Sequence, residues 1–283
     1  MKILITGKSS RIGQAFIEHM KNNHPGEMEI CTVSLRGDEW RGSDWSGYDA
    51  ILHLVGVTEG NAELFFSVNR DLAAEVAQKA KSEKIPYFIY ASTMMVYGES
   101  APIGRSFTID RYTTPSPVSN YGRSKYEGEE AIINLSDPQF SVAIVREPVV
   151  YGEHFDGEFQ KLLALSDMIP FFPTINSSKS YIYEGNLSEC FRQLILNWRS
   201  GVFCPQNSEQ PTTSELFHLM RETAGKKTIR LKGFQPVLSL LSHATKYVNA
   251  VFNDMKYTPE LSRINGLDYC VYSLKETIVR CRK

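Results

Sequence analysis

The first half of the chain alternates short apolar runs with helical patterns, and this alternation limits the possible folds more than any other feature. Apolar, β-rich runs occupy residues 2–6, 29–35, 49–55, 86–92 and 141–145, with helical patterns over 12–20, 62–81 and 121–135 between them. Runs that are apolar throughout, rather than at every second residue, are typical of strands buried on both faces. The pattern therefore predicts an α/β fold with a doubly wound parallel sheet and helices on both faces.

After Gly152 the alternation loosens. Helical patterns cover residues 157–168, 186–198, 213–224, 236–252 and 273–282, and one strand pattern covers 201–206. No linker rich in proline, glycine or serine separates the two halves. We therefore expect residues 1–152 to form a dinucleotide-binding domain. Residues 153–283 should form a smaller substrate-binding lobe, interleaved with late strands of the main sheet.

Composition excludes several classes of function. A net charge of −1 gives no reason to expect nucleic acid or an anionic membrane as a partner. The five cysteines are scattered, without the spacing of metal ligands, so we expect reduced thiols, a cytoplasmic location and no metal site. No segment approaches the ~20 apolar residues of a membrane span. A small molecule is the expected partner.

A glycine-rich turn follows the first predicted strand and reads Thr6-Gly7-Lys8-Ser9-Ser10-Arg11-Ile12-Gly13. Glycine between a strand and a helix lets the backbone approach a pyrophosphate, and the helix N-terminus favours its charge. Ser10 stands where a further glycine is common, and its small side chain still permits close approach. The turn indicates a dinucleotide site, and an ordinary strand–helix turn is the alternative.

Arg36 stands at the end of the second predicted strand. In a dinucleotide fold an acid at this place binds the ribose 2′-hydroxyl of NAD, whereas an arginine accommodates the 2′-phosphate of NADP. Arg36, with Arg11 assisting from the turn, therefore favours NADP(H) over NAD(H). Two alternatives stay open: Asp38 as an NAD-type acid, and Arg36 as a solvated loop charge.

A tyrosine and a lysine lie four residues apart in Tyr121-Gly122-Arg123-Ser124-Lys125, within a predicted helix. Residues at this spacing share one helix face. An ammonium beside a phenol lowers the phenol pKa from its usual value near ~10, which makes an acid–base group for neutral pH. The same pair on a solvated helix surface is the bland alternative.

These motifs occur in the order and spacing of a known family. The chain resembles the extended short-chain dehydrogenase/reductases, the nucleotide-sugar epimerase/dehydratase family, over nearly its whole length. That resemblance implies a Rossmann-type fold with a smaller C-terminal lobe. The matching segments are Thr6-Gly7 to Gly13, Asp49 to Gly56, Asn69, Ser92 to Gly98, Tyr121 to Lys125, Arg146 to Gly152 and Tyr181 to Leu187.

The resemblance implies a role for each motif. Tyr121 is the acid–base group, Lys125 holds the nicotinamide ribose and lowers the tyrosine pKa, and Thr93 hydrogen-bonds the reacting oxygen. The implied cofactor contacts are Gly7, Ser10, Arg11, Ile12 and Gly13 along the pyrophosphate, Leu54, Val55 and Gly56 under the adenosine, Pro148 and Val150 at the nicotinamide, and Asn69. From the residues alone, Asn69 is a helix cap and His53 a core histidine.

Two departures from the family pattern narrow the chemistry. Sugar 4,6-dehydratases of the family carry an Asp-Glu pair after the catalytic threonine, whereas Met94-Met95 follow Thr93 here. Elimination of water needs a second acid and base, so we expect no dehydratase. Many epimerases also place an asparagine at the position of Val149 to contact the substrate diphosphate. The other candidates for that contact, which are equally surface charges, are Arg230, Lys232 and Arg263.

Three functions remain open from the sequence. The first is an NAD(P)H-dependent reductase of a 4-keto (nucleotide-)sugar, and the second is a nucleotide-sugar 4-epimerase that uses the same three catalytic residues. The third is a cofactor-sensing scaffold, since fold does not fix function. We also expect a possible homodimer through the 62–81 helix and the Tyr121 helix. The 236–252 helix is either a core-facing element or a lid for a lipid-linked substrate.

Overall fold

The protein is described here by a computed structural model that covers residues 1–234, 236, 238–239, 248 and 251–282. Within this part of the chain, six parallel strands form the main sheet in the order β10-β6-β4-β3-β1-β2. The predicted α/β fold with a parallel, doubly wound sheet is confirmed. The sheet strands are β1 (Lys2–Thr6), β2 (Glu29–Val33), β3 (Ala50–His53), β4 (Tyr87–Thr93), β6 (Ser141–Glu147) and β10 (Gly201–Phe203).

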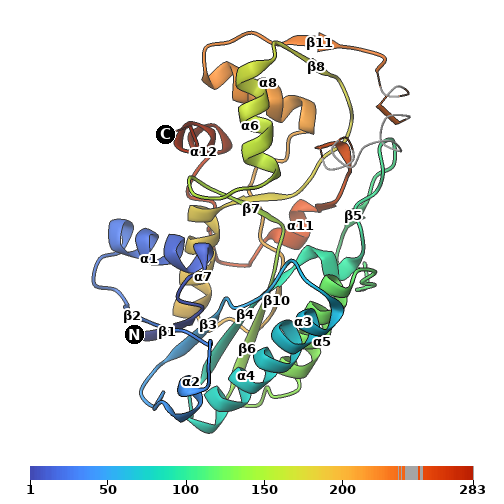
Figure 1. Ribbon diagram of the computed structural model, residues 1–283. Coiled ribbons are helices and arrows are strands. Elements are labelled where there is room, and N and C mark those ends of the chain that lie inside the picture. The colour runs from blue at the N-terminus through green and yellow to red at the C-terminus, as the bar shows by residue number, and fades with distance from the viewer. Residues whose placement is uncertain (235, 237, 240–247, 249–250, 283) are drawn as a thin grey trace.

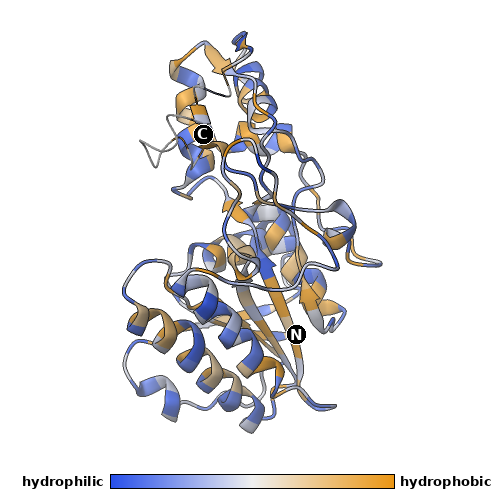
Figure 2. Cartoon of the chain, turned by 90° about the vertical axis from the view of Figure 1, so that its right-hand side faces the viewer, coloured by the Kyte–Doolittle hydropathy of each residue, from blue (hydrophilic) through white to orange (hydrophobic). Residues whose placement is uncertain are grey.

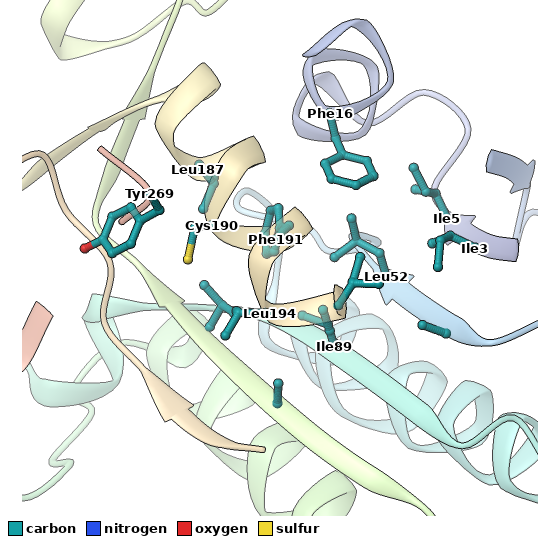
Figure 3. Packing of buried hydrophobic residues seen from close by; sticks show 14 of the residues in the cluster. Ile3, Ile5, Phe16, Leu52, Ile89, Leu187, Cys190, Phe191, Leu194 and Tyr269 are labelled. Carbon is teal, nitrogen blue, oxygen red and sulfur yellow. The ribbon is translucent and has the colours of Figure 1, made fainter. Parts of the chain in front are cut away.

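Helices cover both faces of the sheet (Figure 1). One face carries α1 (Arg11–Asn23) and α7 (Glu184–Leu196), which pack on each other and on the sheet. Figure 3 shows Phe16 of α1 and Phe191 of α7 meeting Ile5 and Leu52 of the strands. The opposite face carries the elements α2 (Glu39–Gly42), α3 (Ala62–Phe66), η1 (Ser67–Leu72), α4 (Ala73–Ser82) and α5 (Asn120–Ile133).

The predicted helix over 62–81 is present, but its middle is not α-helical. Residues Ser67–Leu72 form a π-helical stretch between α3 and α4. Gly128 of α5 faces this stretch, and a Cβ there would lie 2.4 Å from the Asn69 carbonyl oxygen. Only a residue without a side chain therefore allows α5 to approach the π-helical stretch this closely.

Most of the second half forms a lobe above the sheet, whereas α7 and β10 belong to the sheet layers (Figure 1). Its strands occur as parallel pairs, β7 with β9, β8 with β11 and, using β5 from the first half, β5 with β12. Their bounds are β5 (Thr108–Ile109), β7 (Val149–Tyr151), β8 (Phe171–Pro173), β9 (Tyr181–Tyr183), β11 (Ile229–Leu231) and β12 (Lys256–Tyr257). The sequence patterns predicted none of these pairs.

Helices of the lobe match the predicted patterns more closely. The bounds are α6 (Glu158–Met168), α8 (Thr213–Thr223), α11 (Pro259–Ser262) and α12 (Leu274–Arg280). A capping box formed by Thr212 and Glu215 begins α8, as the Thr-Thr-Ser signal predicts. Most of the helix predicted over 236–252 lies outside the described residues. Whether it is a core element or a lid therefore stays a prediction. The boundary at residue 152 stays a prediction.

Hydrophobic residues concentrate between these layers. In Figure 2 the helices beside the sheet carry both hydrophilic and hydrophobic bands, as expected for helices with one buried face. His53 lies in β3 and is fully buried, with its Nδ1 atom 2.9 Å from Thr6 Oγ. Burial lowers the pKa of His53 to about 3, so this histidine is neutral. The expected core histidine is confirmed.

Candidate active site

A cavity of about 830 Å³ opens at the carboxyl ends of β1, β2 and β3. Ligands bind at this edge in open α/β sheets. Six predicted cofactor residues line the cavity, namely Gly7, Ser10, Arg36, Leu54, Val55 and Gly56. The sequence analysis did not assign the other lining residues, which are Lys8, Ser9, Gln14, Ser34, Leu35, Val57, Val68 and Leu72.

The glycine-rich turn has the geometry of a phosphate cradle. Gly7 has a φ of +96°, and a Cβ there would lie 3.2 Å from the Val55 side chain. Ser10 caps α1, and its Oγ atom accepts a hydrogen bond from the Gly13 N–H at 3.3 Å. The backbone N–H groups of the first helical turn and the helix dipole favour an anion here. The residues present therefore fit a dinucleotide.

The polar end of the cavity is basic. Lys8 and Arg36 line it beside Ser34, and none of the described lining residues is acidic. Asp38, the alternative NAD-type acid, is not among them and instead forms an ion pair with Arg41 at the start of α2. The cavity therefore presents positive charge where the ribose of an adenine nucleotide would end.

Some predicted cofactor residues do not line this cavity. Arg11 forms an ion pair with Asp156 at 2.8 Å, and Ile12 packs against the core between α1, α7 and the sheet. Gly13 lies against Leu54, where a Cβ would be 3.3 Å from the leucine side chain. Pro148 and Val150 lie at the β6–β7 junction and are at least half-buried. Their direct contacts with a cofactor stay predictions.

Lys125 connects the cavity to the predicted catalytic residues. Its Nζ atom donates to the Ala91 carbonyl oxygen at 2.9 Å and lies 4.8 Å from the centre of the Tyr90 ring. A Cβ on Gly56, in the cavity wall, would lie 2.9 Å from the same Nζ atom. Gly122 brings α5 this close, because a Cβ there would lie 2.6 Å from the Met95 carbonyl oxygen.

Asn69 is not a helix cap. It lies inside the π-helical stretch, fully buried, and its side-chain amide bonds both backbone groups of Val57, at 2.9 and 3.0 Å. A third bond joins Asn69 to Ser124 Oγ at 3.1 Å. The cap expectation is wrong, because the helix begins at Ala62 and already has Asn61 as its cap. Asn69 fixes the loop after β3, which forms the cavity wall.

Thr93 and Tyr121 meet at the end of β4. Thr93 is the last residue of that strand, and its Oγ atom accepts the Met95 N–H at 3.3 Å to cap the short helix η2 (Met94–Tyr97). Burial raises the pKa of Tyr121 to about 12, a hydrogen bond with Thr93 lowers it in part, and Glu147 raises it further. The expected lowering of the Tyr121 pKa is therefore wrong for the protein without cofactor, because burial outweighs the stabilisation of the phenolate.

Glu147 is a member of this site that the sequence analysis missed. It is the last residue of β6 and pairs in register with Thr93 of β4, so both side chains leave the sheet on the same face. The carboxyl is buried, and its Oε1 atom has no hydrogen-bond partner among the described residues. The sequence offers one signal for this residue: Glu147 is an acid that follows the buried run 141–145 and Arg146.

A second polar cluster lies beside the first. Arg146 binds Glu129 of α5 through its Nε and Nη2 atoms, the latter at 2.7 Å, and binds the Tyr97 hydroxyl at 2.7 Å. Ser92 donates a short hydrogen bond to the same carboxylate. Burial opposes the charge of Arg146, but its hydrogen bonds and ion pair with Glu129 outweigh burial and raise its pKa, so the guanidinium stays charged and paired.

One further group in the described residues has metal-ligating side chains in reach of one another. His19, His24 and Glu189 place their ligand atoms within 4.8 Å between α1 and α7. Both imidazoles lie 3.1 Å from the same carboxylate, which also binds Arg192 at 2.8 Å. An arginine on the carboxylate opposes a cation there, so we interpret the group as a hydrogen-bonded cluster. None of the five cysteines forms a disulfide.

Comparison with known proteins identifies the family of the chain. The model of a family described as "NAD dependent epimerase/dehydratase family" matches residues 3–169, more than half of the 283 residues. The chain belongs to the NAD dependent epimerase/dehydratase family. The matched segment runs from β1 to the end of α6 and includes the cavity, Thr93, Tyr121, Lys125 and Glu147.

Curated relatives and solved structures agree with this assignment. A UDP-glucose 4-epimerase of Vibrio cholerae is 26% identical over 175 residues, which is 59% of this chain and about half, 52%, of that protein. A putative UDP-glucose 4-epimerase of Methanocaldococcus jannaschii is 28% identical over 264 residues, 79% of this chain and 82% of that one. The structure of a dTDP-4-dehydrorhamnose reductase from Bacillus anthracis in complex with NADP shares the fold, with a TM-score of 0.72, 19% identity and coverage of 99% and 98%.

Membership confirms the predicted family. The description of the family names NAD, and the cavity residues fit such a dinucleotide. Among the described helices, none combines the length and apolar character that a bilayer crossing requires. The homodimer and the cytoplasmic location stay predictions.

Proposed function

We propose that the protein is an NADPH-dependent reductase of 4-keto nucleotide sugars. The observation that carries this proposal is the basic end of the cofactor cavity, where Lys8 and Arg36 stand without an acid among the described lining residues. An arginine at this place accommodates the 2′-phosphate of NADP. A reductase uses up one reduced cofactor per turnover, and NADPH is the form that such a cavity would select.

The catalytic residues suit the reductive direction. When bound, the nicotinamide supplies the hydride. Tyr121 keeps its proton at neutral pH because burial raises its pKa, so it can donate that proton to the oxygen that becomes a hydroxyl. Thr93 accepts the Met95 N–H and is also hydrogen-bonded to Tyr121, so it stands beside the proton donor and would contact the same substrate oxygen. Lys125, against Gly56, would hold the cofactor ribose.

The surroundings of Thr93 support reduction without elimination. Met94 and Met95 follow it in η2, and Met94 is buried. Neither side chain can transfer a proton, whereas loss of water from a sugar needs a second acid and base. The carboxyl of Glu147 lies on the neighbouring strand, and the charge of Lys125 acts on it by opposing the rise in pKa that burial causes.

A nucleotide-sugar 4-epimerase is the second candidate, favoured by the names of the Vibrio and Methanocaldococcus relatives. It would use Thr93, Tyr121 and Lys125 in the same way. The two functions differ in how they handle the cofactor, because an epimerase regenerates it in each turnover and has no need to release it. A cofactor-sensing scaffold is disfavoured, since it would not need a threonine, tyrosine and lysine placed together.

The first experiment determines which cofactor the protein takes. The purified protein is denatured and any released nicotinamide is identified, and the emptied protein is then titrated with NADH and NADPH. A protein that arrives empty and binds NADPH more tightly supports the reductase. Tightly retained NAD(H) contradicts the proposal and favours the epimerase. Turnover is then tested with 4-keto nucleotide sugars by following NADPH absorbance.

Arg36→Asp tests the basic end of the cavity. We expect NADPH affinity to fall by roughly ten- to a hundredfold, because a hydrogen bond to a charged group contributes about 1.5–3 kcal/mol. NADH affinity should be unchanged or higher. Asp38→Asn is the matched control, because Asp38 does not line the cavity. If Arg36→Asp leaves the NADPH to NADH ratio unchanged, Arg36 does not select the cofactor.

A further inference from the structure

Glu147 is a buried carboxyl without the partners that buried carboxyls normally have. Its side chain is 9% exposed, and the Oε1 atom bonds nothing in the described part of the chain. Moving a carboxylate out of water costs several kcal/mol unless a charge and hydrogen bonds compensate. The preceding residue cannot compensate, because Arg146 points the other way and binds Glu129.

Glu147 pairs in register with Thr93, and Lys125 Nζ binds the carbonyl oxygen of Ala91, two residues earlier on the same strand, so the lysine lies near this carboxyl. The groups that act on Glu147 come from three elements. α5 contributes Lys125, whose charge lowers the Glu147 pKa, and Tyr121, whose own pKa Glu147 raises. α7 contributes the Cys190 thiol, and β4 contributes Thr93 opposite in register. Glu129 also acts on Lys125, although its carboxylate is bound to Arg146. Among these groups, Lys125 is the cation that acts on Glu147.

Lys125 in turn depends on Glu147. Burial lowers the Lys125 pKa, and the nearby carboxyls of Glu147 and Glu129 oppose that lowering. Burial correspondingly raises the Glu147 pKa, and Lys125 opposes this. Two buried groups that each favour the charge of the other titrate as a pair. The pair adjoins Gly56 in the cofactor cavity on one side and Tyr121 on the other.

We propose that Glu147 is a positioning residue that becomes charged opposite Lys125 and thereby keeps Lys125 and Tyr121 protonated as the pH rises. The part of this proposal that concerns Tyr121 rests on the proposed reductase, which needs a tyrosine that can donate a proton. The part that concerns Lys125 needs only a bound nicotinamide dinucleotide. An acid at the end of β6 thus has a role that packing does not give it.

The sign of the effect follows from the charges. Removing the carboxylate takes away a negative charge that favours the ammonium of Lys125 and the neutral phenol of Tyr121. Both groups should then lose their protons at lower pH. The ammonium contributes to cofactor affinity, so the pH above which affinity declines should be lower in the variant. The pH above which the reduction rate declines should be lower as well.

The test compares Glu147→Gln with the wild type. NADPH affinity is measured by nicotinamide fluorescence from about pH 6 to about pH 10, a range that brackets the titration of a buried lysine. We expect the pH at which affinity falls to move down by about one unit or more in Glu147→Gln, the size expected for loss of an adjacent charge. Glu130→Gln, an exposed carboxyl on the same helix, should leave this pH unchanged.

Further variants separate a charge effect from a structural one. Glu147→Asp keeps the carboxylate and should restore part of the shift, and it also serves if Glu147→Gln does not fold. In a Lys125→Met background, Glu147→Gln should no longer alter the pH dependence of NADPH affinity. An unshifted profile in a folded Glu147→Gln variant overturns the proposal, as does a Glu147→Asp profile shifted as far as that of Glu147→Gln, and so does a shift that persists in the Lys125→Met background.

The pH–rate profile supplies the second readout. If turnover of a 4-keto nucleotide sugar is found, its alkaline limb should move to lower pH in Glu147→Gln while the maximal rate changes less. A wild type that reduces no such sugar defeats the proposed function but leaves the affinity profile as a valid test of Glu147. An alkaline limb that stays in place, or moves to higher pH, overturns the part of the proposal that concerns Tyr121.

Discussion

Two buried polar groups stand side by side at the ends of β4 and β6, and they differ in how completely they are paired. Ser92 and Arg146 contact Glu129 of α5, and the guanidinium and carboxylate bond each other through several atoms. The next residue of each strand, Thr93 or Glu147, points away from that cluster, because consecutive strand side chains alternate. There Glu147 Oε1 has no hydrogen-bond partner among the described residues.

The difference separates a stabilising cluster from a reactive one. A satisfied buried network fixes the packing of α5 against the sheet and has little freedom to change its charge. A buried carboxyl without hydrogen-bond partners has a shifted pKa, and such groups cluster at functional sites. Strands β4 and β6 therefore carry both groups: Ser92 and Arg146 on one face, and Thr93 and Glu147 on the other. The variants below should affect stability in the first group and chemistry in the second.

Tyr121→Phe should produce the largest effect on chemistry. Loss of the proton donor should reduce turnover by about 10²–10⁴-fold, the usual contribution of general acid catalysis. The free energy of unfolding and NADPH affinity should change little, because the ring and its contact with Phe65, 6.0 Å between centroids, are kept. Steady-state kinetics and denaturant unfolding measure the two quantities. Near-normal turnover in this variant would show that Tyr121 is not the proton donor.

Arg146→Met should produce the largest effect on stability. It leaves Glu129 buried without its cation, which costs about 3–5 kcal/mol of unfolding free energy in comparable cases. Denaturant unfolding at neutral pH measures the loss. Arg123→Met, on the exposed face of α5, is the control and should change stability by less than about 0.5 kcal/mol. If the two variants lose equal stability, the paired cluster is not stabilising the fold.

Glu147→Gln should change how stability depends on pH. Burial raises the Glu147 pKa, so the folded state binds this proton more tightly than the unfolded state. The resulting stability is present below the ordinary carboxyl pKa and is lost as pH rises toward the folded pKa, by at most about 1.4 kcal/mol per pH unit. The difference in unfolding free energy between wild type and variant should therefore fall between about pH 5 and about pH 8, where the raised pKa of Glu147 lies. A difference that stays constant over this range would mean that Glu147 is already ionised.

Ser92→Ala should produce the smallest effect. It removes one hydrogen bond to Glu129 but leaves the arginine in place, so unfolding free energy should fall by about 1 kcal/mol. Turnover should be unchanged, since Ser92 belongs to the paired cluster. Thermal or denaturant unfolding measures the first quantity and initial rates the second. A loss of turnover without loss of stability would place Ser92 in the reactive group instead.

The sequence was sufficient for the sheet and for the residues at its edge. β1 occupies Lys2–Thr6 as predicted, because a strand buried on both faces must be apolar throughout. The glycine turn, Arg36 and residues 54–56 line one cavity, since parallel strands end at the same edge. The lobe strands, by contrast, are two or three residues long and pair with strands far away in the sequence, so no local pattern predicts them.

The errors at the site have a common cause. The Tyr121 pKa depends on how deeply α5 buries the phenol, and the spacing of Tyr121 and Lys125 says nothing about burial. Glu147 was missed, because its lack of partners depends on the direction of the Arg146 side chain, which the sequence does not show. Asn69 was interpreted as a helix cap because asparagine favours that position. It lies inside the helix instead, and its side chain bonds the backbone of Val57, a contact that no local pattern predicts.

The π-helical stretch at Ser67–Leu72 has a consequence for how related sequences are compared. A π-helical turn holds one residue more than an α-helical turn, so α3 and α4 are offset by about 100° in helical phase. The offset lets Phe65 meet Tyr121 while Val76 and Ala77 still face the sheet. A homologue with an uninterrupted helix should therefore align with a one-residue gap inside residues 67–72. A gapless alignment would assign every residue on one side of that stretch to the wrong face.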